Sequence, residues 1–157
     1  MIVRRYVFDE SIALASYSDL LRQISRFASL GGVVLDGDGS RYSALALAVI
    51  DDLASEMVAV ERNQHAWPGT LKILSADATR YMFRLSSGSL EILAGNARTL
   101  FDWQNPRLPE DLHFMRLDHS PVLGTIAHED YAWLELSDEE AARWQATGWF
   151  PIHLESD

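Results

Sequence analysis

The chain of 157 residues contains no cysteine, a single lysine and no long hydrophobic run. The absence of cysteine excludes disulfides, a thiolate nucleophile and zinc held by cysteine. The longest apolar run covers residues 44–50, whereas a helix that spans a bilayer needs about 20 apolar residues. The first ten residues, MIVRRYVFDE, lack the apolar segment of a signal peptide. These absences predict a cytoplasmic protein that is not inserted in a membrane.

Basic residues are also scarce, because 23 Asp and Glu stand against 13 Lys and Arg, giving a net charge of −10. The excess grows toward the C-terminus, where residues 106–157 contain eleven acids and only three bases. A field of this sign repels nucleic acid and anionic membranes and attracts basic proteins. We therefore expect a basic protein partner, no nucleic acid and no membrane, although solubility alone also explains such a charge.

The third quarter of the chain carries the clearest structural pattern. Short runs rich in branched and aromatic residues occupy residues 113–117, 122–128 and 131–136, and turn residues separate them. This pattern predicts a three-stranded antiparallel meander. Ser137 followed by Glu140 forms a capping box, which predicts a helix over residues 138–147 directly after the last strand.

Elsewhere, apolar residues at helical spacing predict a helix over residues 17–29, which begins at Ser16 and stops at Gly31 and Gly32. Residues 41–54 leave helix and strand open, with helix slightly favoured. Several further strands are predicted, and two of them, residues 79–85 and 90–95, are expected to form a hairpin. The predicted strands outside the meander cover residues 1–8, 33–35, 57–62, 79–85 and 90–95.

Together these elements predict one α+β domain over residues 1–157, with a mainly antiparallel, twisted sheet. Two or three helices should pack on one face of this sheet, among them those of residues 17–29 and 138–147. No repeat, low-complexity tract or long linker divides the chain into further domains.

One local motif suggests chemistry. The stretch VVLDGDGS resembles the first motif of haloacid-dehalogenase-type phosphatases. By this resemblance Asp36 would attack phosphorus and Asp38 would act as general acid and base, with magnesium between them. That family also needs a later lysine and a further acidic pair after βα crossovers, and the sole lysine, Lys72, has no convincing acidic pair after it. Because Asp-Gly-Asp-Gly is also ordinary turn chemistry, we favour a turn with no metal and no cofactor, and keep a metal-dependent phosphatase as the alternative.

The aromatic residues of the acidic half offer a second interpretation. Tyr131 and Trp133 share one face of a predicted strand, so either that face or the opposite one must be buried. Packing of the tryptophans in the core is favoured, with partner binding beside acidic residues as the alternative. The candidate binding residues are Glu129, Asp130, Trp133, Trp144 and Trp149.

Residues 108–140, LPEDLHFMRLDHSPVLGTIAHEDYAWLELSDEE, resemble a segment of small, acidic, uncharacterised bacterial proteins and are similar to immunity proteins of bacterial toxin systems. The resemblance implies a compact, cytoplasmic α+β protein that neutralises a toxin domain by covering it. It carries over no individual binding residue. The leading hypothesis is therefore a protein-binding module without catalysis. The two alternatives are a regulatory or structural domain whose partner cannot be named and an enzyme that uses Asp36. The oligomeric state is left open.

Overall fold

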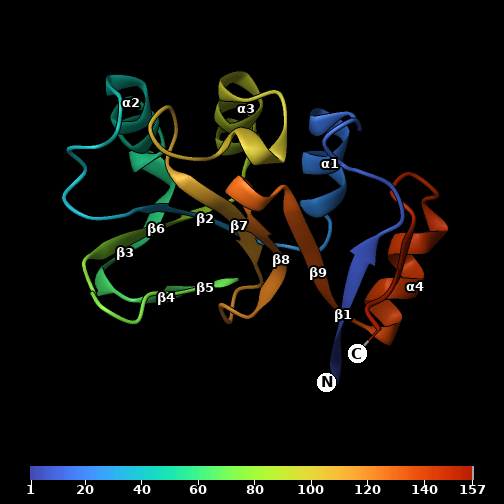
Figure 1. Cartoon of the computed structure of the whole chain (residues 1–157). Coiled ribbons are helices and arrows are strands. Elements are labelled where there is room, and N and C mark those ends of the chain that lie inside the picture. Colours follow the sequence, from blue (N-terminus) through green and yellow to red (C-terminus); the bar gives the residue numbers. More distant parts are fainter. Residues whose placement is uncertain (157) are drawn as a thin grey trace.

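The computed structural model describes residues 1–156 (Figure 1). Over these residues the chain forms an eight-stranded sheet in the order β10-β1-β9-β8-β7-β2-β6-β3, in which every neighbouring pair is antiparallel, and a small β4–β5 hairpin. The α+β class and the antiparallel sheet are thus confirmed. The helices and strands are β1 (Val3–Phe8), α1 (Tyr17–Ile24), β2 (Leu30–Leu35), α2 (Ala44–Asp52), β3 (Met57–Gln64), β4 (Ala66–Trp67), β5 (Thr70–Leu71), β6 (Ala78–Arg84), α3 (Ser87–Asn96), β7 (Glu110–Met115), β8 (Pro121–Ile126), β9 (Tyr131–Ser137), α4 (Asp138–Ala146) and β10 (Ile152–Leu154).

The predicted meander is β7, β8 and β9, which lie side by side in the middle of the sheet. The predicted capping box at the start of α4 is also confirmed. Ser137 Oγ accepts a hydrogen bond from the backbone N–H of Glu140 at 3.2 Å, and Glu140 Oε2 accepts one from the N–H of Ser137 at 2.8 Å. Two unpaired donors of the first helical turn are satisfied in this way.

Helix α1 starts after Ser16 as predicted, but it already ends at Ile24. Gly31 and Gly32 therefore do not stop it. Both glycines belong to the buried strand β2 instead. A Cβ atom on Gly31 would lie 2.5 Å from the Phe83 ring, and one on Gly32 would lie 2.3 Å from Nε2 of His113. These positions are glycine because two rings lie directly against the strand, so the prediction of a helix stop was wrong.

The predicted strand over residues 90–95 is also wrong, because this segment belongs to helix α3. Ser86 Oγ accepts from the N–H of Ser89 at 3.2 Å and Ser89 Oγ accepts from the N–H of Ser86 at 2.8 Å, so the presumed turn is a helix cap. Leu93 is fully buried in the core. Residues 41–54, left open by the sequence, contain helix α2, which Ser43 caps.

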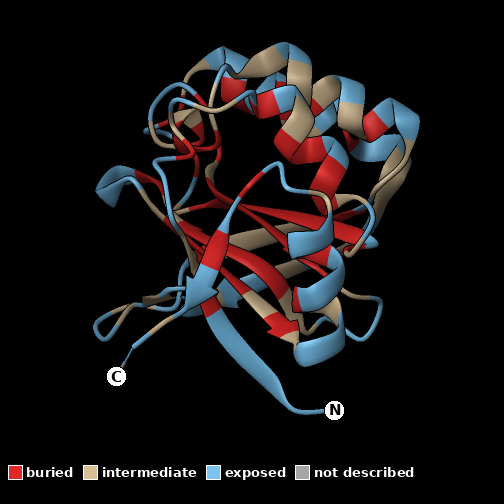
Figure 2. Cartoon of the chain, turned by 90° about the vertical axis from the view of Figure 1, so that its right-hand side faces the viewer, coloured by how far each residue is buried: buried red, intermediate tan, exposed pale blue. Residues whose placement is uncertain are grey.

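The main core lies between the sheet and the helices on one of its faces (Figures 1 and 2). Helices α1, α2 and α3 lie on that side of the sheet, and α4 adds Trp144 to the same core beside Phe8 and Phe27. The β4–β5 hairpin lies on the opposite side (Figure 1), where Trp67 packs against Val34 and Ala78. Among residues 1–156, none of the helices combines the length and the apolar character needed to cross a bilayer.

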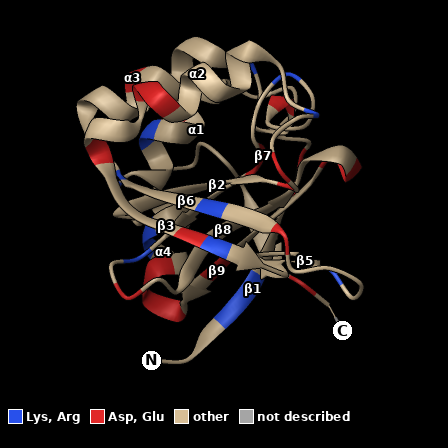
Figure 3. Ribbon diagram, turned by 90° about the vertical axis from the view of Figure 1, so that its left-hand side faces the viewer, with Lys and Arg blue, Asp and Glu red and all other residues tan. Residues whose placement is uncertain are grey.

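Both edges of the sheet are irregular. At one edge, β3 departs from regular pairing with β6 near both of its ends, and Asn63 adopts a positive φ of 56°. Figure 3 shows an acidic and a basic segment on β3 beside a basic segment on β6, where Glu61 pairs with Arg80 at 3.8 Å. At the other edge, β10 has only three residues and follows Pro151. Such features discourage strand addition from another chain, so contacts with a partner are better sought elsewhere.

Candidate binding surface at one end of the sheet

Antiparallel pairing brings several acidic loops to one end of the sheet. Leu35 at the end of β2 pairs with Thr79 near the start of β6, and Ile126 at the end of β8 pairs with Tyr131 at the start of β9. We name this region the acidic end. Its acidic residues, all in the strand termini or within three positions of them, are Asp9, Glu10, Asp36, Asp38, Asp77, Glu110, Asp111, Glu129 and Asp130.

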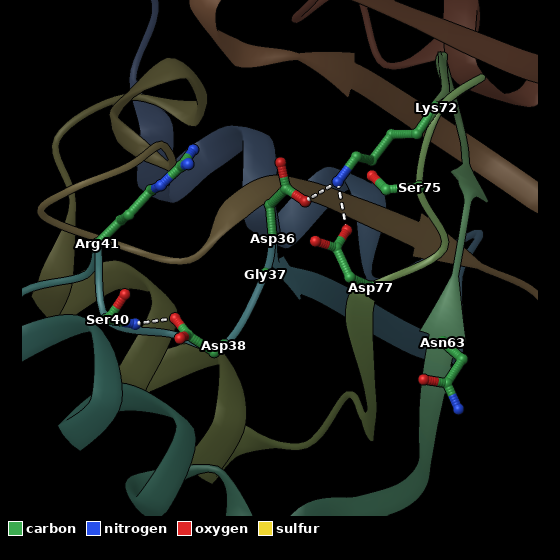
Figure 4. Close-up of a pocket in the computed structure, with 9 residues that line it drawn as sticks. All are labelled: Asp36, Gly37, Asp38, Ser40, Arg41, Asn63, Lys72, Ser75 and Asp77. Atoms are coloured by element: carbon green, nitrogen blue, oxygen red, sulfur yellow. Dashed lines mark hydrogen bonds and ion pairs between the residues drawn. The ribbon is translucent and has the colours of Figure 1, made fainter.

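One hollow at the acidic end is lined by Asp36 and has a volume of about 710 Å³ (Figure 4). Lys72 Nζ donates hydrogen bonds to Asp36 Oδ1 and, at 2.5 Å, to Asp77 Oδ1. These bonds hold the pKa of Lys72 above its usual value and the pKa of Asp77 below its usual value. The only lysine of the chain therefore joins the loop before β6 to the end of β2.

Asp38 does not point toward this ion pair. Its Oδ1 accepts from the backbone N–H of Ser40 at 2.9 Å, and hydrogen bonds from Ser40 hold its pKa below the usual value. Figure 4 shows Asp36 directed toward Lys72 and Asp38 directed toward Ser40. The two carboxylates that the phosphatase resemblance would place around one magnesium ion thus diverge. The positive φ of Gly37 and Gly39 is that of the expected turn.

The rest of the framework also differs from that resemblance. Strand β2 lies between antiparallel neighbours β7 and β6, where the phosphatase motif requires parallel strands joined by helices. In the part of the chain that the structure describes, no three His, Asp or Glu side chains are grouped so that they could hold a metal ion.

The sequence did not predict that Lys72 and Asp77 lie next to Asp36. The β2–β6 register is the signal that could have done so, because Leu35 opposite Thr79 places the residues after β2 next to those before β6. That register depends on pairing between strands more than 40 residues apart, and the sequence alone does not specify it.

A second hollow, of about 390 Å³, shares Asp36 and Lys72 with the first and adds Glu110, Asp111 and His128. Burial raises the pKa of Glu110, and the nearby charges of Asp111 and Asp36 raise it further. Carboxylates are therefore crowded here into a region of negative potential.

Asp111 has a structural role in that hollow. It is almost fully buried and adopts a positive φ of 53°. Its Oδ2 accepts from Trp67 Nε1 at 2.8 Å and its Oδ1 accepts from the N–H of Ala127 at 3.0 Å. Asp111 thereby fixes the β4–β5 hairpin and the turn that leads to Glu129.

Glu129 and Asp130 are exposed, as expected for a turn between two strands. Asp130 adopts the left-handed conformation at the start of β9. A hollow of about 250 Å³ connects Asp130 with Asp9 and Glu10 at the end of β1. The next hollow, of about 160 Å³, also includes Glu10 and is bordered by Trp149 and Leu14. The two hollows share Phe8, Glu10, Ser11 and Ile12, so they form one continuous surface.

The tryptophans predicted to bind a partner differ in accessibility. Trp149 is 51% exposed and lies on the surface just described. Trp133 and Trp144 are only 1% and 0% exposed, so the expectation that they offer surface anchors is corrected.

Their contacts explain why both are buried. Trp133 lies against Gly69 and Gly124, and the guanidinium of Arg5 lies 4.8 Å from its ring centroid. Trp144 donates from Nε1 to the carbonyl of Phe150 at 2.8 Å within the main core. Strand β9 and helix α4 each have a buried side, and Trp133 and Trp144 lie on these buried sides.

Comparison with known proteins identifies no family: no protein-family model, no curated protein and no solved structure matches this chain. The function is therefore argued from the geometry of the acidic end. Three of the five candidate residues from the sequence, Glu129, Asp130 and Trp149, are available on it.

Proposed function

We propose that this protein is a non-catalytic protein-binding module whose acidic end covers a basic surface of another protein. One observation carries the proposal: the half-exposed Trp149 and the carboxylates of Glu10 and Asp130 border two adjoining hollows. An aromatic residue next to acidic groups can supply both of the contributions that binding a basic protein requires.

The acidic groups act mainly on the rate of encounter. A net charge of −10 raises the local concentration of a positively charged partner and speeds its association. Charge at the rim of an interface adds little affinity by itself, because water screens it. Trp149, with Leu14 beside it, can add the desolvated contact that slows dissociation.

We further propose that the partner is a basic toxin domain and that the protein neutralises it by occlusion in the bacterial cytoplasm. The resemblance of residues 108–140 to immunity proteins supports this more specific proposal. The test is co-expression of the chain with each of the genes adjacent to its own, to find one whose product stops growth. We expect the wild-type chain to rescue growth and Trp149→Ala to rescue it less well. Equally strong rescue by a variant in which Glu129, Asp130 and Trp149 are all substituted would contradict the proposal.

The general proposal is tested by capturing the partner from cells of the native host on the immobilised protein and measuring its association and dissociation rates. We expect the association rate to fall at least tenfold between low and physiological salt, with little change in dissociation. The double substitution Glu129→Lys and Asp130→Lys should slow association strongly as well.

A matched control is available at the opposite end of the molecule. Asp51 and Asp52 are also adjacent and exposed, but they lie at the end of α2, away from the acidic end. Asp51→Lys with Asp52→Lys produces the same change in net charge. If both double variants slow association equally, only the overall charge matters and the acidic end is not the binding surface.

A further inference from the structure

The end of β5 and the loop that follows it present three large apolar side chains to solvent. Leu71, Ile73 and Leu74 are 67%, 88% and 98% exposed. A single exposed apolar side chain is common on any protein surface, whereas a contiguous group of them marks an interaction site. Nothing within residues 1–156 covers Ile73 or Leu74 to any large extent.

This loop is held in place at its base. Lys72, between the apolar residues, donates from Nζ to Asp36 and Asp77, and its backbone N–H donates to the carbonyl of His65 at 2.7 Å. The side chains of Lys72, Asp36 and Asp77 are 21%, 31% and 55% exposed, so water screens the ion pair with Asp77 more than the one with Asp36. A partner that binds such a loop loses less conformational entropy than one that must first order it.

The surroundings of the loop define the chemistry of what it binds. The 710 Å³ hollow of the acidic end is lined by the carboxylates of Asp36, Asp38 and Asp77 and by two cations, Arg41 and Lys72, so acids are in excess there (Figure 4). A second copy of this chain carries the same net charge of −10 and is repelled. An anionic membrane surface is repelled for the same reason. A basic polypeptide with apolar side chains is complementary to both features.

We propose that Ile73 and Leu74 form an apolar docking site for a basic segment of the partner. Apolar side chains of that segment lie on Ile73 and Leu74, and its Lys or Arg side chains reach the exposed carboxylates of Asp38 and Asp77 in the adjoining hollow. The inference rests on the proposed function, and it adds a contact at the other side of the acidic end from Trp149.

The first test selects ligands from a phage-displayed library of random dodecapeptides on the immobilised wild-type protein. Selected peptides are synthesised, and their dissociation constants are measured by fluorescence anisotropy. We expect peptides with net positive charge and large apolar residues, which bind the Ile73→Ser, Leu74→Ser variant at least tenfold more weakly than the wild type.

The control variant is Ile2→Ser with Leu117→Ser, which removes two apolar side chains elsewhere that are 78% and 74% exposed. It should bind within about twofold of the wild type, since surface apolar groups outside the site contribute little. Peptides that bind the Ile73 and Leu74 variant as well as the wild type would overturn the inference. So would sedimentation of the wild type, but not of this variant, with phosphatidylcholine vesicles, because the loop would then be a membrane anchor.

Measurements on the captured partner separate this inference from the proposed function. If Glu129→Lys with Asp130→Lys weakens binding and Ile73→Ser with Leu74→Ser does not, the docking site is wrong and the acidic binding module stands. If neither pair of substitutions changes binding, both proposals fail. Weakening by both, through association for the first and dissociation for the second, is the expected result.

Discussion

Arg80 on β6 donates its Nε–H to Nε2 of His113 on β7 at 3.0 Å, across the strand β2 that lies between them. Gly32 makes this contact possible, because its missing side chain leaves space for the imidazole ring. Nε2 accepts, so Nδ1 carries the proton and donates it to the carbonyl of Asp111 at 2.7 Å. The pair thus holds His113 in one neutral tautomer, next to the residue that fixes the acidic end.

Acidification should destabilise the protein through His113. Burial, assisted by the charge of Arg80, lowers the pKa of His113 from 6.5 to about 3. Between these values the unfolded chain binds more protons than the folded one. The contribution of His113 to the free energy of unfolding is therefore complete above pH 6.5 and is lost as the pH falls toward 3, by at most about 1.4 kcal/mol per pH unit.

The measurement is urea denaturation of the wild type and of His113→Gln between pH 4 and 7. A glutamine amide can still accept from Arg80 and does not titrate, so the variant should lose less stability per pH unit than the wild type. Carboxylates with lowered pKa, such as Glu140, add an acid dependence to both proteins, which the comparison removes. Parallel pH profiles would show that His113 is not buried in its neutral form.

The cap of α4 provides a test of the local structure. Ser137→Ala removes the acceptor for the N–H of Glu140 and should lower the free energy of unfolding by about 1 kcal/mol. Glu140 stays in place in the variant, because Arg116 Nη2 donates to it at 2.6 Å. Ser18→Ala, an exposed position within α1, serves as the control and should change stability very little. An unchanged denaturation midpoint for Ser137→Ala would contradict the observed helix start.

The features that the sequence predicts well depend on neighbouring residues. The meander and the Ser137 cap involve short-range patterns, so alternation and spacing were sufficient to identify them. Helix α3 was missed because Ser86 to Ser89 suit a hairpin turn and a helix cap equally well, and the tertiary contact of the buried Leu93 decides between them.

The features that the sequence could not predict involve distant residues. Lys72 meets Asp36 only because β2 and β6 pair in one particular register. Trp133 is buried because the glycines at positions 69 and 124 accommodate its ring, and Trp149 remains exposed after the turn that ends α4. Residue type alone does not separate these two tryptophans, since either one could pack in the core.

The Asp36 hollow should not bind magnesium. Lys72 already donates to Asp36, and Asp38 points toward Ser40, so a magnesium ion coordinated by both carboxylates would have to break both arrangements. Titration calorimetry at neutral pH should detect no binding of magnesium or calcium with a dissociation constant below about a millimolar. Asp36→Asn provides the comparison. Binding tighter than that value, abolished by this substitution, would instead support a phosphatase-like site.

Trp149 should account for nearly all fluorescence that a soluble quencher can reach. It is 51% exposed, whereas the other four tryptophans are at most 7% exposed. Acrylamide quenching of the wild type should therefore reveal an accessible fraction that disappears in Trp149→Phe.

If Trp149 is a binding anchor, the captured partner should protect this fraction in the wild type. Trp149→Ala should then speed dissociation at least tenfold and leave the salt dependence of the association rate unchanged. A partner that binds tightly but leaves Trp149 open to acrylamide would place the contact elsewhere on the acidic end. If Trp149→Ala also abolished the salt dependence of the association rate, charge and aromatic contact would not act separately.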